Sequence, residues 1–69
     1  MNKIRKISIG KDLKEAIHYH IGGKGAKGTI HEIVYEDVWF NIYIIEENVI
    51  QLWKKVNINM GIAVEFDID

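Results

Sequence analysis

The chain has 69 residues, of which 48% are apolar and 28% are charged, and its net charge is −1 at neutral pH. This composition is typical of one small globular domain over residues 1–69, and it excludes a disordered chain. There is no run of about 18 apolar residues, so we expect no transmembrane helix and no contact with a membrane. The basic residues 1–9 lack the apolar segment of a signal peptide, so we expect a cytoplasmic protein.

The sequence contains no cysteine. It therefore predicts no disulfide, no thiolate metal site and no thiol nucleophile. A domain this short buries little of its surface and is marginally stable by itself. Because no cross-link is available, we expect a homo-oligomer.

The apolar residues are mostly β-branched: Ile occurs 14 times and Val 5 times, against 2 leucines. Branched side chains suit a pleated sheet and lose rotamer freedom in a helix. The composition therefore favours a mainly β fold. Heavy use of Ile and Lys also indicates an AT-rich coding sequence, such as that of a bacteriophage, and suggests a host-directed, anti-defence role.

Residues 3–9 are predicted to form the first strand, which ends at Gly10. Strict alternation places Ile7 and Ile9 on one face of this strand and Ile4 on the other.

The next segment, residues 11–21, fits two structures. Its apolar residues match both a helical spacing and a strand alternation. We expect a short helical turn near 11–15 that leads into a strand at 16–21. A helix over 12–21 is the alternative, and it would make the fold α+β.

A glycine-rich segment follows at residues 22–28, with four of the six glycines. We expect a mobile, exposed loop. It contains a G-x-G-x-x-G pattern, but the dinucleotide fingerprint requires a following helix, and residues 29–36 are predicted to form a strand. Lys24 and Lys27, with the bare glycine amides, are candidates for closing over a phosphate. The alternative is a plain flexible connection.

The clearest element is a hairpin of strands 38–45 and 49–56. We expect a three-residue loop at 46–48, because this register gathers the apolar residues on one face. That predicted core face comprises Val38, Phe40, Ile42, Ile44, Ile50, Leu52 and Val56, with Lys54 near the strand end.

The opposite face of this hairpin is the best candidate binding site. In the same register it carries Trp39, Asn41, Tyr43, Ile45, Val49, Gln51, Trp53 and Lys55. Aromatic rings can stack on a planar ligand, amides can bind its edges and an ammonium group can meet a phosphate. Such residues are equally typical of a protein interface, so a subunit contact or an internal packing layer is the alternative.

A turn is predicted at residues 57–61 and a last strand at 62–68. In this strand Ile62, Val64, Phe66 and Ile68 point inward, while Ala63, Glu65 and Asp67 point outward. Together the elements predict a small antiparallel sheet or open barrel of about five strands, with at most one short helix.

Metal binding has little support. His18 and His20 would share a face of a strand, but a zinc site needs a third ligand. If Ile21 pairs with Thr29, His31 lies on the opposite face, and only a register slip or a bulge would bring it round. We therefore predict no metal and no cofactor.

Catalysis and nucleic-acid binding are also disfavoured. Neither hydroxyl candidate, Ser8 or Thr29, lies in a nucleophile-elbow sequence, and the carboxylates fall on outward positions. Residues 1–28 carry a charge of +5 and residues 29–69 a charge of −6, so no continuous basic stripe runs along the chain.

The sequence therefore predicts a non-enzymatic binding protein that acts as an oligomer. One hypothesis is the sequestration of a small, anionic, nucleotide-like ligand. Its predicted contacts are Trp39, Asn41, Tyr43, Gln51, Trp53, Lys55, Lys24 and Lys27. The alternative is an inhibitor or adaptor that binds a host protein through the aromatic hairpin face or an edge strand.

Overall fold

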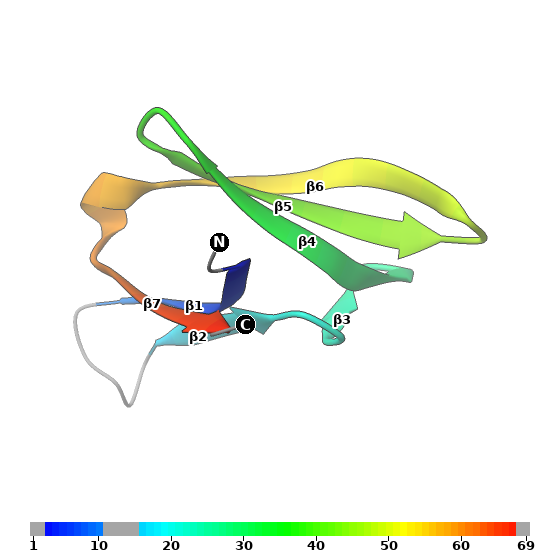
Figure 1. Cartoon of the computed structure of the whole chain (residues 1–69), viewed down its shortest axis with the longest axis horizontal. Coiled ribbons are helices and arrows are strands. Elements are labelled where there is room, and N and C mark those ends of the chain that lie inside the picture. Colours follow the sequence, from blue (N-terminus) through cyan, green and yellow to red (C-terminus); the bar gives the residue numbers. More distant parts are fainter. Residues whose placement is uncertain (1–2, 11–15, 68–69) are drawn as a thin grey trace.

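The chain folds into two antiparallel β-sheets that face each other (Figure 1). The computed structural model describes residues 3–10 and 16–67. The smaller sheet has the order β2-β1-β7 and comprises β1 (Lys3–Ile9), β2 (Ile17–His20) and β7 (Ile62–Asp67). The larger sheet has the order β3-β4-β5-β6 and comprises β3 (Lys24–Gly25), β4 (Gly28–Glu36), β5 (Trp39–Glu46) and β6 (Val49–Asn57). The predicted mainly β class is confirmed.

The ambiguous segment after β1 is a strand where the structure describes it. β2 pairs with β1 in antiparallel register, with Tyr19 opposite Ile7. The predicted strand is therefore confirmed over Ile17–His20, and the alternative helix is wrong there. The predicted helical turn at 11–15 lies outside the described residues.

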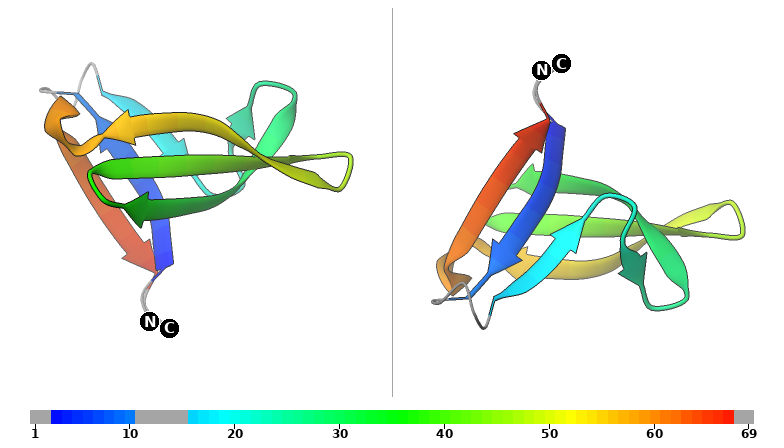
Figure 2. Two further views of the ribbon diagram at one scale, coloured as in Figure 1. Left: turned by 90° about the horizontal axis from the view of Figure 1, so that it is seen from above. Right: turned by 90° about the horizontal axis from the view of Figure 1, so that it is seen from below.

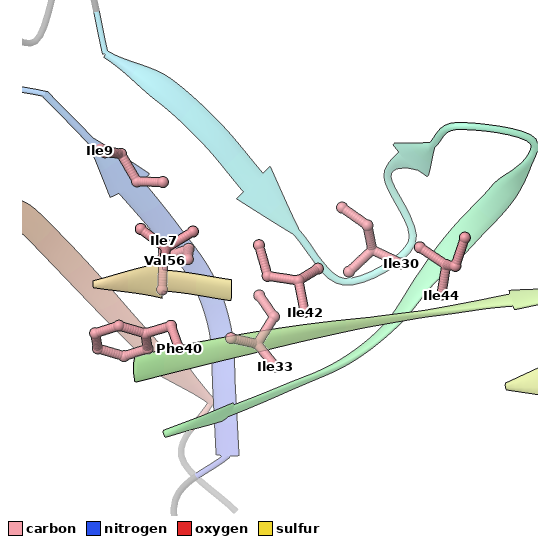
Figure 3. Close-up of a cluster of buried hydrophobic side chains, with 8 residues drawn as sticks. All are labelled: Ile7, Ile9, Ile30, Ile33, Phe40, Ile42, Ile44 and Val56. Carbon is pink, nitrogen blue, oxygen red and sulfur yellow. The ribbon is translucent and has the colours of Figure 1, made fainter. Parts of the chain in front are cut away.

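One apolar core lies between the two sheets, whose strands cross at a steep angle (Figure 2). Its buried members are Ile7, Ile9, Ile30, Ile33, Phe40, Ile42, Ile44 and Val56 (Figure 3). Ile7 and Ile42, one from each sheet, are 0% exposed. The predicted inward positions of Phe40, Ile42, Ile44 and Val56 are thus confirmed.

Two β-bulges bring apolar residues of uneven spacing to this core. In β1 the register shifts between Ile4 and Lys6, which leaves Arg5 as the extra residue. Ile4 therefore packs against the core on the same side as Ile7, and its predicted outward position is wrong. A similar shift at His31 in β4 allows both Ile30 and Ile33 to be buried.

The β5–β6 hairpin differs from its predicted register. Glu46 pairs with Val49, so the loop is the two-residue turn Glu47–Asn48 and not three residues long. Glu47 and Asn48 have φ values of 50° and 66°. Two successive left-handed residues are characteristic of the type I′ turn, whose twist matches that of the flanking strands.

This register exposes several residues that were predicted to be inside. Ile50 and Leu52 are 53% and 48% exposed. Val38, also predicted to be inside, lies in the turn before β5 and is exposed. A third bulge then occurs at Trp53, because Tyr43 pairs with Leu52 whereas Ile42 pairs with Lys54. The bulge restores Val56 to the core.

The glycine-rich segment is ordered by backbone pairing. Lys24 pairs with Thr29, and Gly25, which is buried, pairs with Gly28. In addition, the Ile30 amide donates a hydrogen bond of 2.8 Å to the Gly23 carbonyl. The segment is therefore not an irregular loop throughout: β3 and the start of β4 form a small hairpin, with Gly25 buried and Lys24 and Lys27 exposed as predicted.

A short 3₁₀ helix, η1 (Ile58–Met60), forms the predicted turn and connects the two sheets. Asn57 caps it by accepting a hydrogen bond of 2.9 Å from the Asn59 amide, and Gly61 ends it with φ 72°. In β7 the predicted alternation is confirmed from residue 62 to 65, with Ile62 half-buried and Glu65 exposed. Ile68 and the side chains of Phe66 and Asp67 lie outside what the structure describes.

Candidate binding surface

The side of the larger sheet that points away from the smaller sheet is the candidate site. Alternation along β5 sends one set of side chains to the core and the other set to this side. We call it the outer hairpin face, and its residues are Val34, Trp39, Asn41, Tyr43, Ile45, Ile50, Leu52 and Lys55. Five of them, Trp39, Asn41, Tyr43, Ile45 and Lys55, are residues that the sequence placed together.

Towards the hairpin turn, the outer hairpin face is apolar. Ile45 pairs with Ile50, and Tyr43 pairs with Leu52, so the four side chains form two adjacent rows. Tyr43 and Ile45 are half-buried, whereas their β6 partners are about half-exposed. Cross-strand pairs of this kind contribute about 0.2–1 kcal/mol each and leave the outer side of the rings and methyl groups free for another surface.

Towards the other end of β5, the outer hairpin face is polar. Asn41 pairs with Lys55, and Trp39 pairs with Asn57. The Lys55 ammonium nitrogen lies 5.3 Å from the centroid of the Trp39 ring. This cation–π contact contributes about 0.5–1 kcal/mol at an exposed site. It also occupies a face of the ring that a stacked ligand would need.

Asn41 lies between these two ends and is only 7% exposed. No hydrogen-bond donor from the described residues reaches its Oδ1 atom. Burying an amide oxygen without a donor is unfavourable by about 1–3 kcal/mol. Asn41 is therefore a destabilising feature of the isolated chain, and a bound molecule with an N–H group would relieve it.

The substitution Asn41→Val tests this conclusion. We expect it to raise the free energy of unfolding by about 1 kcal/mol, because Val removes the unpaired oxygen and suits a central strand. Urea denaturation followed by circular dichroism measures the change. A loss of stability would show that the Asn41 side chain is satisfied in solution.

Two residues of the predicted site, Gln51 and Trp53, do not belong to this face. Gln51 pairs with the core residue Ile44 and so points to the inner side of the sheet. Trp53 packs against the core, where its ring meets Tyr19 edge-on with centroids 5.7 Å apart. The prediction that both tryptophans share one face with Asn41 is therefore wrong, and the cause is the two-residue length of the turn.

The predicted phosphate-binding lysines of the glycine segment also lie apart from Trp39. Lys24 is in β3 and Lys27 is in the turn to β4, and both are exposed. Because Thr29 pairs with both Lys24 and Ile45, this small hairpin lies near the Ile45 end of β5. Trp39 is at the opposite end of the strand, so the structure does not assemble all eight predicted contacts into one site.

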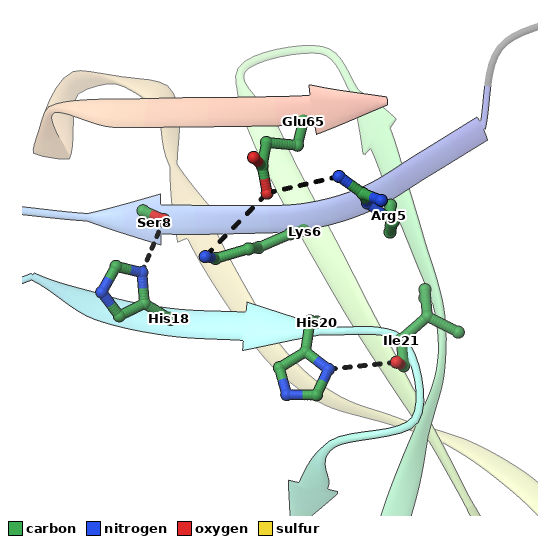
Figure 4. A network of polar contacts seen from close by, with 7 residues as sticks. All are labelled: Arg5, Lys6, Ser8, His18, His20, Ile21 and Glu65. Atoms are coloured by element: carbon green, nitrogen blue, oxygen red, sulfur yellow. Dashed lines mark hydrogen bonds and ion pairs between the residues drawn. The ribbon is translucent and has the colours of Figure 1, made fainter. Parts of the chain in front are cut away.

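The histidines of β2 lie on the outer side of the smaller sheet (Figure 4). His18 Nδ1 is 2.7 Å from Ser8 Oγ, and His20 Nδ1 is 3.1 Å from the Ile21 carbonyl oxygen. On the same sheet, the Glu65 carboxylate is 3.8 Å from the Arg5 guanidinium and 3.9 Å from the Lys6 ammonium. These exposed ion pairs contribute little to stability.

The third histidine does not join the other two. His31 is the extra residue of the β4 bulge, and the pairing of Ile21 with Thr29 that was considered for it does not occur, because Thr29 pairs with Lys24. Within residues 3–10 and 16–67, no three His, Asp or Glu side chains converge as metal ligands. The outer side of the smaller sheet is thus a polar surface with ordinary ion pairs.

Three members of the outer hairpin face were not foreseen: Val34, Ile50 and Leu52. The sequence did contain a signal for the two β6 residues, because Asn48 readily adopts the left-handed conformation and two-residue loops are the commonest in hairpins. The apolar alternation outweighed that signal, since it gave a more complete core face for a three-residue loop.

Comparison of the chain with protein-family models, curated proteins and solved structures finds no match. In the part of the chain that the structure describes, no helix has the length and apolar character needed to cross a membrane.

Proposed function

We propose that this protein is a non-enzymatic binding protein that docks a partner protein on its outer hairpin face. The observation that carries the proposal is the apolar block of Tyr43, Ile45, Ile50 and Leu52, whose two β6 members are about half-exposed in paired rows. Grouped exposure of large apolar side chains is uncommon on a monomeric protein and marks interaction surfaces.

The chemistry of the surrounding residues supports a protein as the partner. Glu32 and Glu36 of β4 pair with Tyr43 and Trp39, and Lys55 lies on the other side of Trp39. An apolar centre with aromatic residues and a charged rim is typical of protein interfaces. Covering the apolar centre would contribute about 25 cal/mol for each Å² removed from water.

The experiment uses the whole protein as bait in a host-cell lysate, with two matched variants. Leu52→Lys places a charge in the apolar block, and Ile17→Lys makes the same change at an exposed residue of the smaller sheet. We expect wild-type protein and Ile17→Lys to retain the same partner and Leu52→Lys to lose it. Retention by Leu52→Lys, or equal loss in both variants, would overturn the proposal, and circular dichroism confirms that both variants fold.

A second candidate is the capture of a small nucleotide-like ligand at the polar end of the outer hairpin face. Its support is that Trp39, Asn41 and Tyr43 follow one another on one side of β5, with Lys55 beside them. A planar base could stack on an aromatic ring and donate an N–H group to Asn41 Oδ1 after Lys55 moves aside.

Native mass spectrometry with linear and cyclic nucleotides separates the two candidates. Addition of one nucleotide mass at fixed stoichiometry, abolished in Trp39→Ala, would favour ligand capture. Absence of any bound mass across the panel would reject it and leave protein docking.

A further inference from the structure

We propose that a second copy of this chain pairs with the free edge of β6, so that two larger sheets join into one continuous sheet. Among the described residues, β6 hydrogen-bonds only with β5, which leaves its other edge without a partner strand. It is nine residues long and contains no proline. A long, unprotected edge strand is a template for pairing with another chain.

The part of β6 next to the turn is accessible for such pairing. The tip of the β5–β6 hairpin extends beyond the smaller sheet (Figure 2). From Val49 to Leu52 every side chain is exposed, and the bulge that interrupts regular pairing begins only at Trp53. A short regular ladder can therefore form over this stretch.

The direction of the backbone groups fits this arrangement. In a two-residue hairpin, the residues that flank the turn form a hydrogen-bonded pair, here Glu46 and Val49. Alternation then directs the backbone amide and carbonyl of Ile50 and Leu52 to the free edge. These two residues provide the donors and acceptors for a second strand.

The charges of the hairpin favour antiparallel pairing of β6 with the same strand of a second copy of the chain. Glu46 and Glu47 are at the turn, and Lys54 and Lys55 are near the other end of the same strand, with no acidic residue between them. Two copies of β6 that run in opposite directions bring the acidic turn of each beside the lysines of the other. Parallel pairing would place like charges together.

A two-fold axis at Gln51 satisfies both the direction of the backbone hydrogen-bonding groups and the pairing of opposite charges. It places Ile50 opposite Leu52 of the second copy as a hydrogen-bonded pair, with both side chains on the outer side. Gln51 faces Gln51 of the second copy, and Val49 faces Trp53 of the second copy on the inner side. Glu47 is then level with Lys55 of the second copy, and the apolar blocks of the two chains become continuous.

Sedimentation velocity of the full chain over a range of concentrations tests the proposal. We expect a dimer for the wild type and for Ile17→Lys, and at least a tenfold weaker association for Ile50→Lys, which sets an ammonium group against Leu52 of the second copy. Association should also weaken with added salt, because the charged contacts are exposed. A wild-type protein that remains monomeric at the highest concentration would overturn the proposal.

Cysteine cross-linking tests the register, and the absence of native cysteines makes each result unambiguous. In Gln51→Cys the two introduced residues form a non-hydrogen-bonded pair, with Cα atoms about 4.5 Å apart, within the range of a disulfide. In Val49→Cys they are about 13 Å apart, because four residues of strand separate them. We expect mild oxidation to produce a covalent dimer at least tenfold faster in Gln51→Cys.

Equal cross-linking rates in the two cysteine variants would reject the proposed register. The sedimentation and cross-linking samples contain no partner protein and no nucleotide. A negative result would therefore reject the proposed dimer without rejecting the proposed function. Circular dichroism of each variant establishes that it folds before its association is measured.

Discussion

Replacing Ile42 by Ala is expected to lower the free energy of unfolding by about 2–5 kcal/mol, the range observed when large aliphatic side chains are truncated in a core. Ile42 is 0% exposed, and it lies in β5 between the core residues Phe40 and Ile44. A core this small provides only about 3–5 kcal/mol in total. The variant should therefore be largely unfolded at room temperature, which urea titration followed by circular dichroism would show.

The matched control is Leu52→Ala, measured in dilute protein. The sequence placed Leu52 in the core with Ile42, whereas the structure leaves it about half-exposed. We expect this control to change the free energy of unfolding by less than about 1 kcal/mol, as is usual for surface positions. Similar losses in the two variants would favour the three-residue loop and contradict the register described here.

Replacing Gly25 by Val has the second largest expected effect. A Cβ atom at Gly25 would lie 2.7 Å from Ile44 Cγ2 and 2.9 Å from Trp53 Cε3, both closer than real contacts allow. The β3–β4 hairpin would have to move off the core. We expect a loss of about 1–3 kcal/mol in the free energy of unfolding, the range for overpacked sites. We also expect a change in tryptophan fluorescence, because the Trp53 ring becomes more exposed to solvent.

Lys24→Val is the control for this substitution, because Lys24 is the exposed neighbour on the same short strand. It should leave both the stability and the fluorescence close to those of the wild type. An equally mild effect of Gly25→Val would mean that the glycine segment is loosely held in solution, as the sequence had suggested.

Most strands of this fold were predictable from the sequence because β-branched runs and turn residues determine them locally. The predicted strands at 3–9, 29–36 and 62–68 correspond closely to β1, β4 and β7. Only β3 was missed, since a Lys-Gly dipeptide has no strand propensity. It is held in the sheet by its pairing with β4, with Gly25 buried near Ile44 and Trp53.

Side-chain direction was less predictable, and the bulges explain why. Each bulge, at Arg5, His31 and Trp53, adds one residue to a strand and reverses the alternation beyond it. Strict alternation therefore placed Ile4 outside, whereas the bulge at Trp53 returns Lys55 and Val56 to the faces predicted for them. No local residue pattern predicts a bulge here, because the position of each bulge is determined by how the two sheets pack around the core.

The same errors limited the prediction of the candidate site. Trp39, Asn41 and Tyr43 were grouped correctly because all three belong to β5, which contains no bulge. Gln51 and Trp53 were misplaced because their side depends on the register with a second strand. Within one strand the sequence determines the face, whereas across strands the turn length determines it.

The pairing of β1 with β7 has a consequence for synthesis of the protein. Lys3 lies opposite Asp67, so the smaller sheet joins segments from distant parts of the sequence. The β4–β5–β6 meander contains mostly local contacts and can form early, but the sheet that faces it is complete only after β7 has left the ribosome. We therefore expect the nascent chain to acquire protease resistance in a single late step, after translation has passed β7.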